Sequence, residues 1–416
     1  MTYGMGRVPG ARDERPALVR CVGVPAEEFG AEYWGRRPLL SRATDPGRTS
    51  KSFEDLITVA DVDELIGRRG LRTPFLRMAR DGDLLPVSEY AGPGGAGAQV
   101  SDQALDERVL AGYADGATLV LQGLHRLWPP LGDFARRLAA DLGHPVGVNA
   151  YLTPPANQGF DTHYDTHDVF VLQIAGGKHW RIHPPVVRDP LGGQPWQSRT
   201  QEITATAHGE PALQTVLEPG DALYLPRGWL HSAQARGELS MHLTVGVYPV
   251  TRYALVEALL AHAAEEPRLR RSLPLGAEAA LGDELDGTIR TVIDWLSTVD
   301  ADAVAERVRT RLWQQSRPDP IRPLAQAAAL RTVGPQTRIT ARGHGPWRLS
   351  REGDDQVVLR VFDRTIRFPA YCEAAVRAAL SGEVRQVAEL PGLDAADQIT
   401  LTRRLLREAV VVPLEP

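Results

Sequence analysis

Two histidines and one aspartate have the residue types and the spacing of a metal-binding site. His163 and Asp165 stand two positions apart in the run His163-Tyr164-Asp165, and His231 follows 66 residues after Asp165. In an extended strand, residues i and i+2 point to the same side, so His163 and Asp165 can bind one ion together. Two imidazoles and one carboxylate hold non-haem Fe(II) on one face and leave the other face open. The pattern predicts an iron site if a second strand brings His231 alongside.

The residues that lead up to His231 make this prediction more specific than the triplet alone. Pro219-Gly220-Asp221 predicts a turn into a strand at 222–225, and the run Pro226-Arg227-Gly228 predicts a second turn before His231. A histidine after such a run is the usual distal ligand of a cupin barrel. An isolated histidine is most often a core residue, so the combination is what favours a metal site.

Four other histidines compete for the metal. His167 is four residues after His163, which would suit a helix, but the chain has no HExxH motif and the flanking residues read as strand. His179, His183 and His242 fall within predicted strands. We expect these four side chains to pack or to support the ligands rather than to bind the metal.

The elements around these residues form a β-rich middle region between two helical ones. Short runs of β-branched and aromatic residues with turn signals between them predict a sandwich or a barrel, and residues 174–178 predict a tight hairpin. Before the barrel, helical spacing is found at 26–34, 59–67 and 123–142, with a glycine-rich loop at 90–100. The strands are expected at 146–152, 169–174, 179–183, 222–225 and 241–248.

The last third of the chain predicts two further units. Residues 252–264 and 288–315 show helical spacing, and residues 317–320 read as a linker. In the remainder, strands at 349–351 and 357–362 and helices at 368–380 and 396–408 follow in the order of a winged helix. The expected division is a flexible leader at 1–20, a catalytic domain at 21–250, a helical domain at 251–316 and a winged helix at 321–416.

Composition excludes several classes of protein. A net charge of −5 gives no overall attraction to nucleic acid or to an anionic membrane. No apolar run approaches the roughly 20 residues of a membrane span, and the polar N-terminus lacks a signal-peptide core. Cys21 and Cys372 lie far apart in the sequence and are expected to be free thiols. We therefore expect a cytoplasmic protein.

Lysine is so rare in this chain that each retained lysine is a candidate functional residue. Of the 47 basic residues only Lys51 and Lys178 are lysines, and the others are arginines. Lys178 follows Asp165 by 13 residues, close to the candidate metal ligands.

With these motifs in place, the chain resembles the JmjC-type 2-oxoglutarate-dependent oxygenases, and within them the ribosomal oxygenases. The resemblance rests on Tyr33-Trp34-Gly35-Arg36-Arg37-Pro38, on the run from His163 through Asp168-Val-Phe-Val-Leu-Gln173, and on the run Leu223 to His231. It implies that His163, Asp165 and His231 hold Fe(II), and that Lys178 pairs with the distal carboxylate of 2-oxoglutarate. Asn149, Tyr151 and Thr244 match positions that line the co-substrate pocket, and O2 is the second co-substrate.

The resemblance also implies a fold and a reaction. The fold is α+β: a double-stranded β-helix (the cupin or JmjC jelly-roll barrel), then a helical dimerisation domain and a C-terminal winged helix. The reaction is hydroxylation of an arginine or histidine side chain in a protein, with a ribosomal protein as the expected substrate. The expected assembly is a homodimer without membrane or direct DNA contact. Two positions depart from the family: Gly246 replaces a small polar residue, and His167 replaces other residues.

N-methyl-lysine demethylation stays open through the same iron chemistry, although nothing in the sequence indicates an aromatic cage or a histone reader. Two further functions also stay open. One is a biosynthetic oxygenase that acts on a small molecule or a peptide natural product. The other is a non-catalytic cupin or a DNA-binding regulator that uses the winged helix. The candidate recognition region carries Arg403, Arg404 and Arg407, but also Asp394, Asp397 and Glu408, whereas a DNA reader normally shows a clearer basic face.

Overall fold

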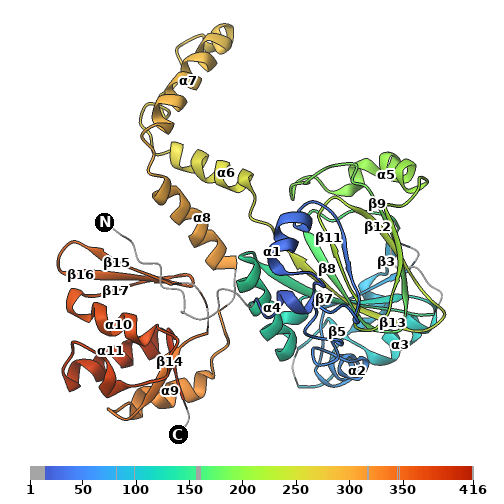
Figure 1. The fold of residues 1–416 in the computed structure, drawn as a ribbon, viewed down its shortest axis with the longest axis horizontal. Coiled ribbons are helices and arrows are strands. Elements are labelled where there is room, and N and C mark those ends of the chain that lie inside the picture. Colours follow the sequence, from blue (N-terminus) through green and yellow to red (C-terminus); the bar gives the residue numbers. More distant parts are fainter. Residues whose placement is uncertain are drawn as a thin grey trace. The chain divides into compact units, whose positions relative to one another are not determined.

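The computed structural model describes residues 15–80, 82–97, 99–155, 161–315, 318–343, 345 and 347–414. The chain forms two compact units, one spanning Gly10–Pro249 and the other consisting mainly of Val250–Pro416. Figure 1 colours the first unit from blue to yellow-green and the second from yellow to red.

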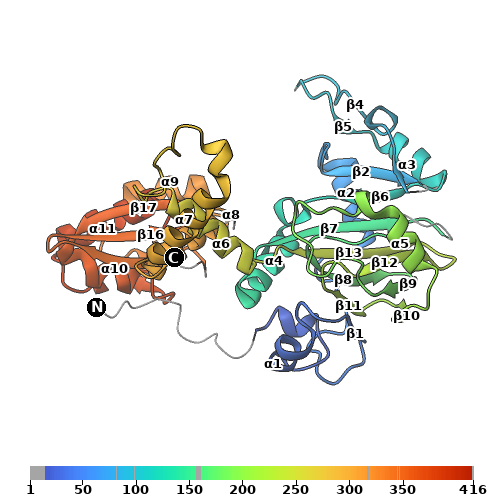
Figure 2. The same ribbon diagram turned by 90° about the horizontal axis from the view of Figure 1, so that it is seen from above.

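The first unit is built on two antiparallel sheets (Figure 2). The larger has the strand order β1-β11-β8-β13-β7-β6-β2-β3, and the smaller has the order β10-β9-β12. Two further two-residue strands, β4 (Ala91–Gly92) and β5 (Gln103–Ala104), pair with each other. The strands of the large sheet are β1 (Leu39–Ser41), β2 (Leu76–Arg80), β3 (Asp83–Leu84), β6 (Thr118–Leu121), β7 (Val146–Thr153), β8 (Asp168–Ala175), β11 (Ala222–Leu225) and β13 (Ser240–Val247). Those of the small sheet are β9 (Lys178–His183), β10 (Leu213–Leu217) and β12 (Leu230–Ala235).

Strand β8 shows why the two sheets pack face to face. Its side chains alternate between two hydrophobic clusters, as the two-residue period of a strand requires. Val169 and Val171 point inward and pack with Trp180 of the small sheet. Phe170 and Leu172 point outward into the main core. Because β8 is buried on both faces, its sequence is a continuous apolar run rather than an alternating one.

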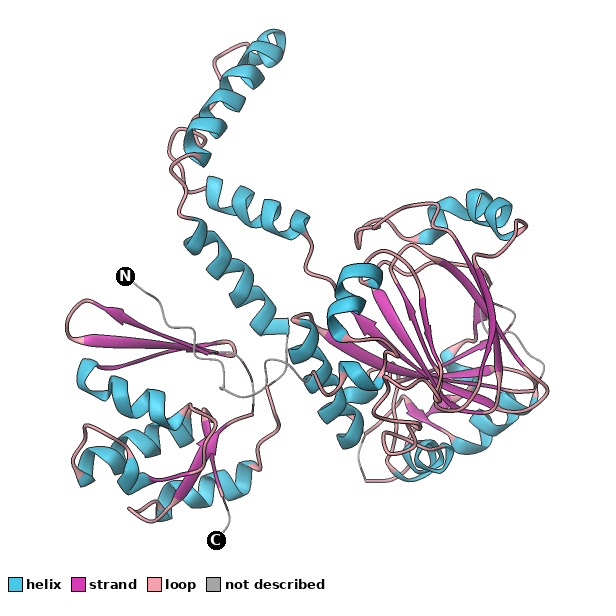
Figure 3. Cartoon of the chain, viewed as in Figure 1, coloured by secondary structure: helices cyan, strands magenta, loops and turns pink. Residues whose placement is uncertain are grey.

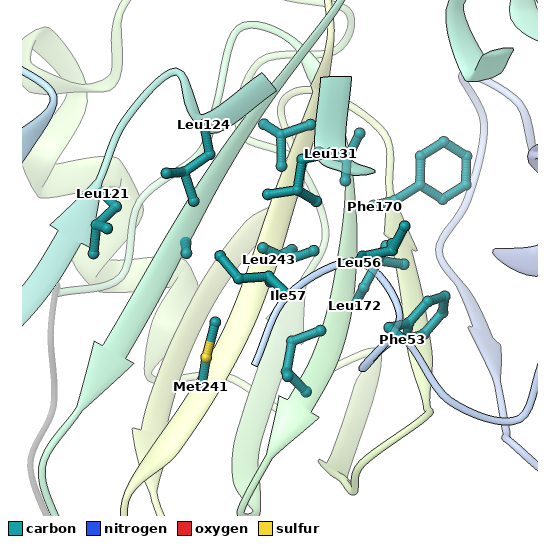
Figure 4. Close-up of a cluster of buried hydrophobic side chains, with 14 of the residues drawn as sticks. Phe53, Leu56, Ile57, Leu121, Leu124, Leu131, Phe170, Leu172, Met241 and Leu243 are labelled. Atoms are coloured by element: carbon teal, nitrogen blue, oxygen red, sulfur yellow. The ribbon is translucent and has the colours of Figure 1, made fainter. Parts of the chain in front are cut away.

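Helices and loops from the N-terminal part of the chain cover the outer face of the large sheet. Figure 4 shows Phe53, Leu56 and Ile57 packed against Leu172 and Leu243 of this face. The covering helix α2 begins at a capping box formed by Thr58 and Asp61. The helices of this unit are α1 (Ala26–Glu28), α2 (Val59–Arg68), α3 (Asp106–Ala114), α4 (Pro129–Leu142) and α5 (Thr200–Ala207), with a π-helical turn at Phe29–Tyr33.

In the first unit, three sequence predictions need correction. Residues 174–178 do not close a hairpin, because β8 and β9 belong to different sheets and the turn crosses between them. The helix predicted at 123–142 begins only at Pro129, since Gly123 is left-handed and two prolines fix the first turn. Within the predicted leader, residues 1–14 lie outside the described residues, and Ala17 and Leu18 are buried in the main core rather than flexible.

The second unit contains a helical segment followed by a mixed α+β region with its own core (Figure 3). The predicted helix 288–315 is interrupted near Ser297, and the helix predicted at 368–380 begins later, after a strand and a short 3-10 turn. Its helices are α6 (Arg252–Ala263), α7 (Leu281–Leu296), α8 (Ala301–Gln315), α9 (Pro323–Thr332), α10 (Glu373–Ala379) and α11 (Ala395–Arg407). Its strands are β14 (Arg338–Ala341), β15 (Trp347–Glu352), β16 (Gln356–Val361), β17 (Arg364–Pro369), β18 (Arg385–Gln386) and β19 (Val411–Pro413).

Two predictions about the whole chain can be compared with the structure. Both cysteines are free, as predicted, and both are buried. Within the described ranges, the helices are all too short or too polar to cross a membrane.

Candidate metal centre and its pocket

The structure brings His163, Asp165 and His231 together, as the sequence predicted. His163 and Asp165 lie in the loop before β8, and His231 lies on β12. His163 and His231 form an isolated antiparallel bridge, with the two backbone N–H···O bonds at 3.2 and 2.8 Å. One potential ligand atom from each of the three residues lies within 4.8 Å of the others. Backbone pairing, rather than the side chains, fixes how far apart the two imidazoles stand.

Each imidazole is oriented by its own Nδ1 atom. His163 Nδ1 lies 2.7 Å from the carbonyl oxygen of Asp161, and His231 Nδ1 lies 3.0 Å from that of Trp229. A carbonyl oxygen only accepts hydrogen bonds, so both Nδ1 atoms carry the proton. Both Nε2 atoms then keep a lone pair for a metal ion, which is the usual arrangement at histidine-ligated metals.

Electrostatics favour the ligand forms of this trio. Burial, reinforced by the neighbouring His163, lowers the pKa of His231 to about 4, so His231 is neutral at pH 7. Burial acts to raise the pKa of Asp165, but the surrounding imidazoles of His231, His167 and His163 outweigh it, and the net shift is downward. A neutral histidine and an ionised aspartate are the states that bind a divalent metal.

The turn before His231 is held to the metal loop from two sides. Gly228 N–H donates to the carbonyl oxygen of Asp165 at 3.0 Å. The Asp168 carboxylate accepts from Arg227 N–H at 2.9 Å and from the Tyr224 hydroxyl at 3.0 Å. Gly228 has φ +85°, and a Cβ there would lie 2.4 Å from the carbonyl oxygen of Val187. Asp168, which the sequence did not single out, thus helps to position His231.

Lys178 lies inside the barrel, where the resemblance placed an anion-binding lysine. It begins β9, is 3% exposed, and donates from Nζ to Thr153 Oγ1 at 3.0 Å. Burial lowers its pKa to about 7. An ammonium group has three hydrogens to donate, so one hydroxyl leaves this site short of acceptors.

Other buried donors gather around Lys178. The ring of His242 stacks on Tyr151 at 5.0 Å and meets Trp180 edge-on at 5.6 Å. Burial first, then the charge of Lys178, lowers the pKa of His242 well below its usual value. His242 Nδ1 and Trp180 Nε1 are buried without a hydrogen-bond partner among the described residues. A lysine and two unsatisfied polar nitrogens fit a buried carboxylate.

Asn149, Tyr151 and Thr244 line the same inward face. Thr244 pairs with Asn149, and His242 pairs with Tyr151, in the register of β7 and β13. Asn149 Oδ1 accepts from Gly123 N–H at 3.0 Å, which fixes the orientation of the amide. Asn149, Tyr151 and Thr244 therefore stand together on the inward side of β7 and β13.

A covering segment over the metal loop was missed by the sequence reasoning. The Tyr164 side chain is buried against Ile203 and Leu230, and its hydroxyl donates to the carbonyl oxygen of Gln194 at 2.9 Å. Trp196 packs on this cluster, with its ring 6.0 Å from that of His163. The available signal was the length of the connection between β9 and β10, which is long for a hairpin and carries an apolar tryptophan.

The remaining histidines do not join the metal trio. His183 is buried and His179 half-buried on β9. The His167 ring stacks on Tyr248 at 5.1 Å and lies close to Gly246.

Comparison with known proteins agrees with this geometry. Residues 133–255 match the family model described as a JmjC domain. The chain is 33% identical to ribosomal oxygenase 1 of Gallus gallus over 314 residues, which is 73% of this chain and 47% of that protein. It is 29% identical to the bifunctional lysine-specific demethylase and histidyl-hydroxylase NO66 of Aedes aegypti over 318 residues, 71% of this chain and 47% of that protein. The chain thus spans about half the length of these curated relatives.

Solved structures share the fold. The crystal structure of the Escherichia coli ribosomal oxygenase YcfD superposes with a TM-score of 0.53 at 17% identity, covering 100% of both chains. The structure of YcfD with cobalt and 2-oxoglutarate gives 0.52 at 18% identity, covering 95% of this chain and 99% of that one. The predicted cupin-type JmjC barrel is confirmed. By family match, relatives and fold, this chain carries a JmjC domain and is a relative of the ribosomal oxygenases.

Proposed function

We propose that this protein is an Fe(II)- and 2-oxoglutarate-dependent dioxygenase that hydroxylates an arginine or histidine side chain of a protein, with a ribosomal protein as the expected substrate. One observation carries the proposal: His163, Asp165 and His231 converge in the same barrel interior that holds the buried, under-satisfied Lys178. The names of the relatives, ribosomal oxygenase 1 and histidyl-hydroxylase NO66, support the choice of substrate class.

The three ligands would present two Nε2 atoms and one carboxylate to Fe(II). Both imidazoles already direct their Nδ1–H groups at backbone carbonyls, and Asp165 is ionised. Three protein ligands on one face leave coordination positions for reactants. When bound, Fe(II) and 2-oxoglutarate supply the oxidative chemistry, in which O2 is consumed, 2-oxoglutarate becomes succinate and CO2, and one oxygen atom enters a C–H bond.

Lys178 would bind the distal carboxylate of 2-oxoglutarate. Burial lowers its pKa to about 7, which disfavours the ammonium form, so a carboxylate would restore the proton as it binds. Trp180 and His242 belong to the same buried cluster and offer further polar contacts. Asn149, Tyr151 and Thr244 would shape the rest of the pocket and exclude water from it.

The test has two parts. Purified protein loaded with Fe(II) should convert 2-oxoglutarate to succinate, and His163→Ala should abolish both this turnover and the bound iron. Intact-mass analysis of ribosomal proteins from a deletion strain should then show one protein lighter by the mass of one oxygen atom. Succinate formation without any mass change would keep the oxygenase and reject the ribosomal substrate. A change in a small metabolite instead would favour a biosynthetic oxygenase.

We also propose that residues 251–316 mediate homodimerisation. Helix α7 exposes apolar side chains at steps of three and four residues, which place them on one face of the helix. A second copy of the chain would cover this stripe, since soluble monomers rarely leave such patches exposed. Ile289→Glu should shift the protein to a monomer in sedimentation, whereas a wild-type monomer would reject the proposal. The stripe consists of Leu281, Leu285, Ile289, Ile293 and Leu296.

The C-terminal residues 321–416 are proposed to be a winged helix that does not bind DNA directly. The order α10, β18, α11, β19 supports this interpretation. Asp394 caps the N-terminus of α11, Asp397 lies in its first turn, and Arg404 pairs with Glu408 at 3.0 Å. Acidic groups at the end of a helix that would face base edges repel the phosphate backbone. A gel shift at low salt should show no binding.

Two buried free cysteines support a cytoplasmic site of action.

A further inference from the structure

The inward faces of β7 and β13 lack side chains at one pair of positions. Gly147 and Gly246 are register partners on these strands. The next inward pair, Asn149 and Thr244, carries polar side chains into the chamber. Two facing glycines leave the inward face of β7 and β13 open at this level.

His167 and Tyr248 fill that space. A Cβ at position 246 would lie 2.8 Å from His167 Cδ2 and 2.9 Å from its Nε2. A Cβ at position 147 would lie 3.4 Å from Tyr248 Cε2. The two rings stack at a centroid distance of 5.1 Å and an interplanar angle of 23°. Even an alanine at position 246 would therefore have to displace the imidazole, so the two departures from the family at 167 and 246 are one linked change.

This pair stands at the end of the chamber opposite Lys178. Thr153, the partner of Lys178, is six residues from Gly147 along β7, which is roughly 20 Å of extended strand. Asp165 acts on residues from both parts of this strand pair, because its charge adds to burial in raising the pKa of both Tyr151 and Tyr248. A co-substrate that reaches from Lys178 to the metal leaves the His167 side of the metal for the substrate.

The exposure of the pair agrees with this position. Tyr248 is 52% exposed, and the His167 side chain is half-buried. None of the hydrogen bonds among the described residues uses a ring nitrogen of His167. The Nε2 atom of His167 lies against the backbone of Gly246, so Nδ1 is the ring nitrogen that remains available to another molecule.

We propose that His167 is a substrate-positioning residue, which replaces a side chain at position 246 and, with Tyr248, presents a stacked ring surface to the side chain that is hydroxylated. The ligand it fits is a planar nitrogen-containing side chain, such as guanidinium or imidazole, which stacks on aromatic rings and hydrogen-bonds at its edge. This inference rests on the proposed function.

The test compares wild type, His167→Ala, Gly246→Ser and the double variant, with His208→Ala as a control at an exposed position of the same unit. Each is incubated with Fe(II), 2-oxoglutarate and the ribosomal protein fraction of a deletion strain, and product is counted by intact mass. His167→Ala should lose at least tenfold in product while the KM for 2-oxoglutarate and succinate formation without substrate change less than about twofold. Gly246→Ser should lower the Tm, and the double variant should regain the Tm but not the product, because the hydroxyl then fits the vacated space while the ring that positions the substrate stays absent.

Each outcome bears on the inference. Equal product from wild type and His167→Ala would overturn it and leave the proposed function intact. A rise in the KM for 2-oxoglutarate in His167→Ala would also overturn it, by assigning the residue to the co-substrate. No product from wild type would overturn the ribosomal substrate and this inference together. A Gly246→Ser variant with unchanged Tm would show that the two positions are not linked.

Discussion

The two ends of the barrel interior differ in how completely their polar groups are enclosed. At the Lys178 end, Thr153 and Gln173 are fully buried, and the Gln173 amide donates to two backbone carbonyls and to Ser240. At the opposite end, Tyr248 is half exposed and His167 has no hydrogen-bond partner among the described residues.

This difference indicates which end of the barrel would bind the invariant small co-substrate and which would accept the larger substrate. A closed, prebuilt site suits a small ligand that is always the same, because its polar groups are held in fixed positions before the ligand binds. An open surface of stacked rings suits a larger molecule that arrives from solvent. The metal trio lies between the two, so each end can be disturbed separately by substitution.

The largest effect is expected where the two ends meet, at the metal. Asp165→Ala removes the one anionic ligand and leaves two neutral imidazoles, so metal affinity and turnover should fall at least 100-fold. Bound iron measured by elemental analysis and succinate measured by NMR check this, with His208→Ala as the control. Wild-type iron content in Asp165→Ala would mean that the metal is held elsewhere.

At the closed end, Lys178→Met should weaken 2-oxoglutarate binding and at the same time stabilise the free protein. Losing a charge-assisted contact to a carboxylate costs about 1.5–3 kcal/mol, so the KM for 2-oxoglutarate should rise roughly 10- to 100-fold. The free protein should become more stable, because methionine removes a buried, under-satisfied amine. Succinate kinetics and thermal unfolding measure the two effects. A lower Tm with an unchanged KM would show that Lys178 is structural.

The pKa of Lys178 predicts how 2-oxoglutarate binding and stability change with pH. With a folded pKa of about 7 against 10.5 unfolded, the unfolded chain holds more protons between these values, so this group makes stability rise with pH across that window. Binding of the dianion needs the ammonium, so affinity should weaken up to tenfold per unit above pH 7. Calorimetry of the Mn(II)-loaded protein in two buffers should detect proton uptake, which Lys178→Met should lack.

The metal trio could be predicted from the sequence because the ligand types and a turn motif lie within short segments. The turns at 219–221 and 226–228 direct His231 as expected, but His163 and Asp165 lie in a loop with one bridge to His231 rather than in the expected strand. Lys178 was identified through the family resemblance and its rarity. Its burial could not be read from the sequence, since that depends on which sheet β9 joins.

The parts that were missed depend on contacts between distant segments. The turn at 174–178 has the glycines of a hairpin, yet β8 finds its partners in β11 and β13, and β9 finds its own in β10 and β12. Likewise, the link between His167 and Gly246 joins two positions 79 residues apart. Local propensity cannot show such pairings, because tertiary packing decides them.

A smaller effect should come from the turn that positions His231. In Gly228→Ala, a Cβ would meet the carbonyl oxygen of Val187 at 2.4 Å, and the residue would keep a φ of +85° that L-residues disfavour. The strain should cost about 1–3 kcal/mol, lower the Tm by several degrees and weaken iron binding about tenfold. Gly192→Ala, which meets nothing within 4 Å, is the matched control. Equal Tm values for the two variants would show that the turn can relax without moving the ligand.

The smallest effect should come from Tyr164→Phe, which tests whether the covering segment belongs to the open end. The change removes one hydroxyl that donates to the carbonyl oxygen of Gln194 and keeps the buried ring, so it should cost only about 1 kcal/mol. Because the segment contacts the metal loop through Tyr164 and Trp196, whereas Lys178 hydrogen-bonds to Thr153 on β7, the KM for 2-oxoglutarate should stay constant. Hydrogen exchange at residues 191–203 should become faster, and coupling of succinate formation to product should fall by a few fold. Faster exchange with unchanged coupling would make the segment a structural cover, and a raised KM would mean that the two ends are not independent.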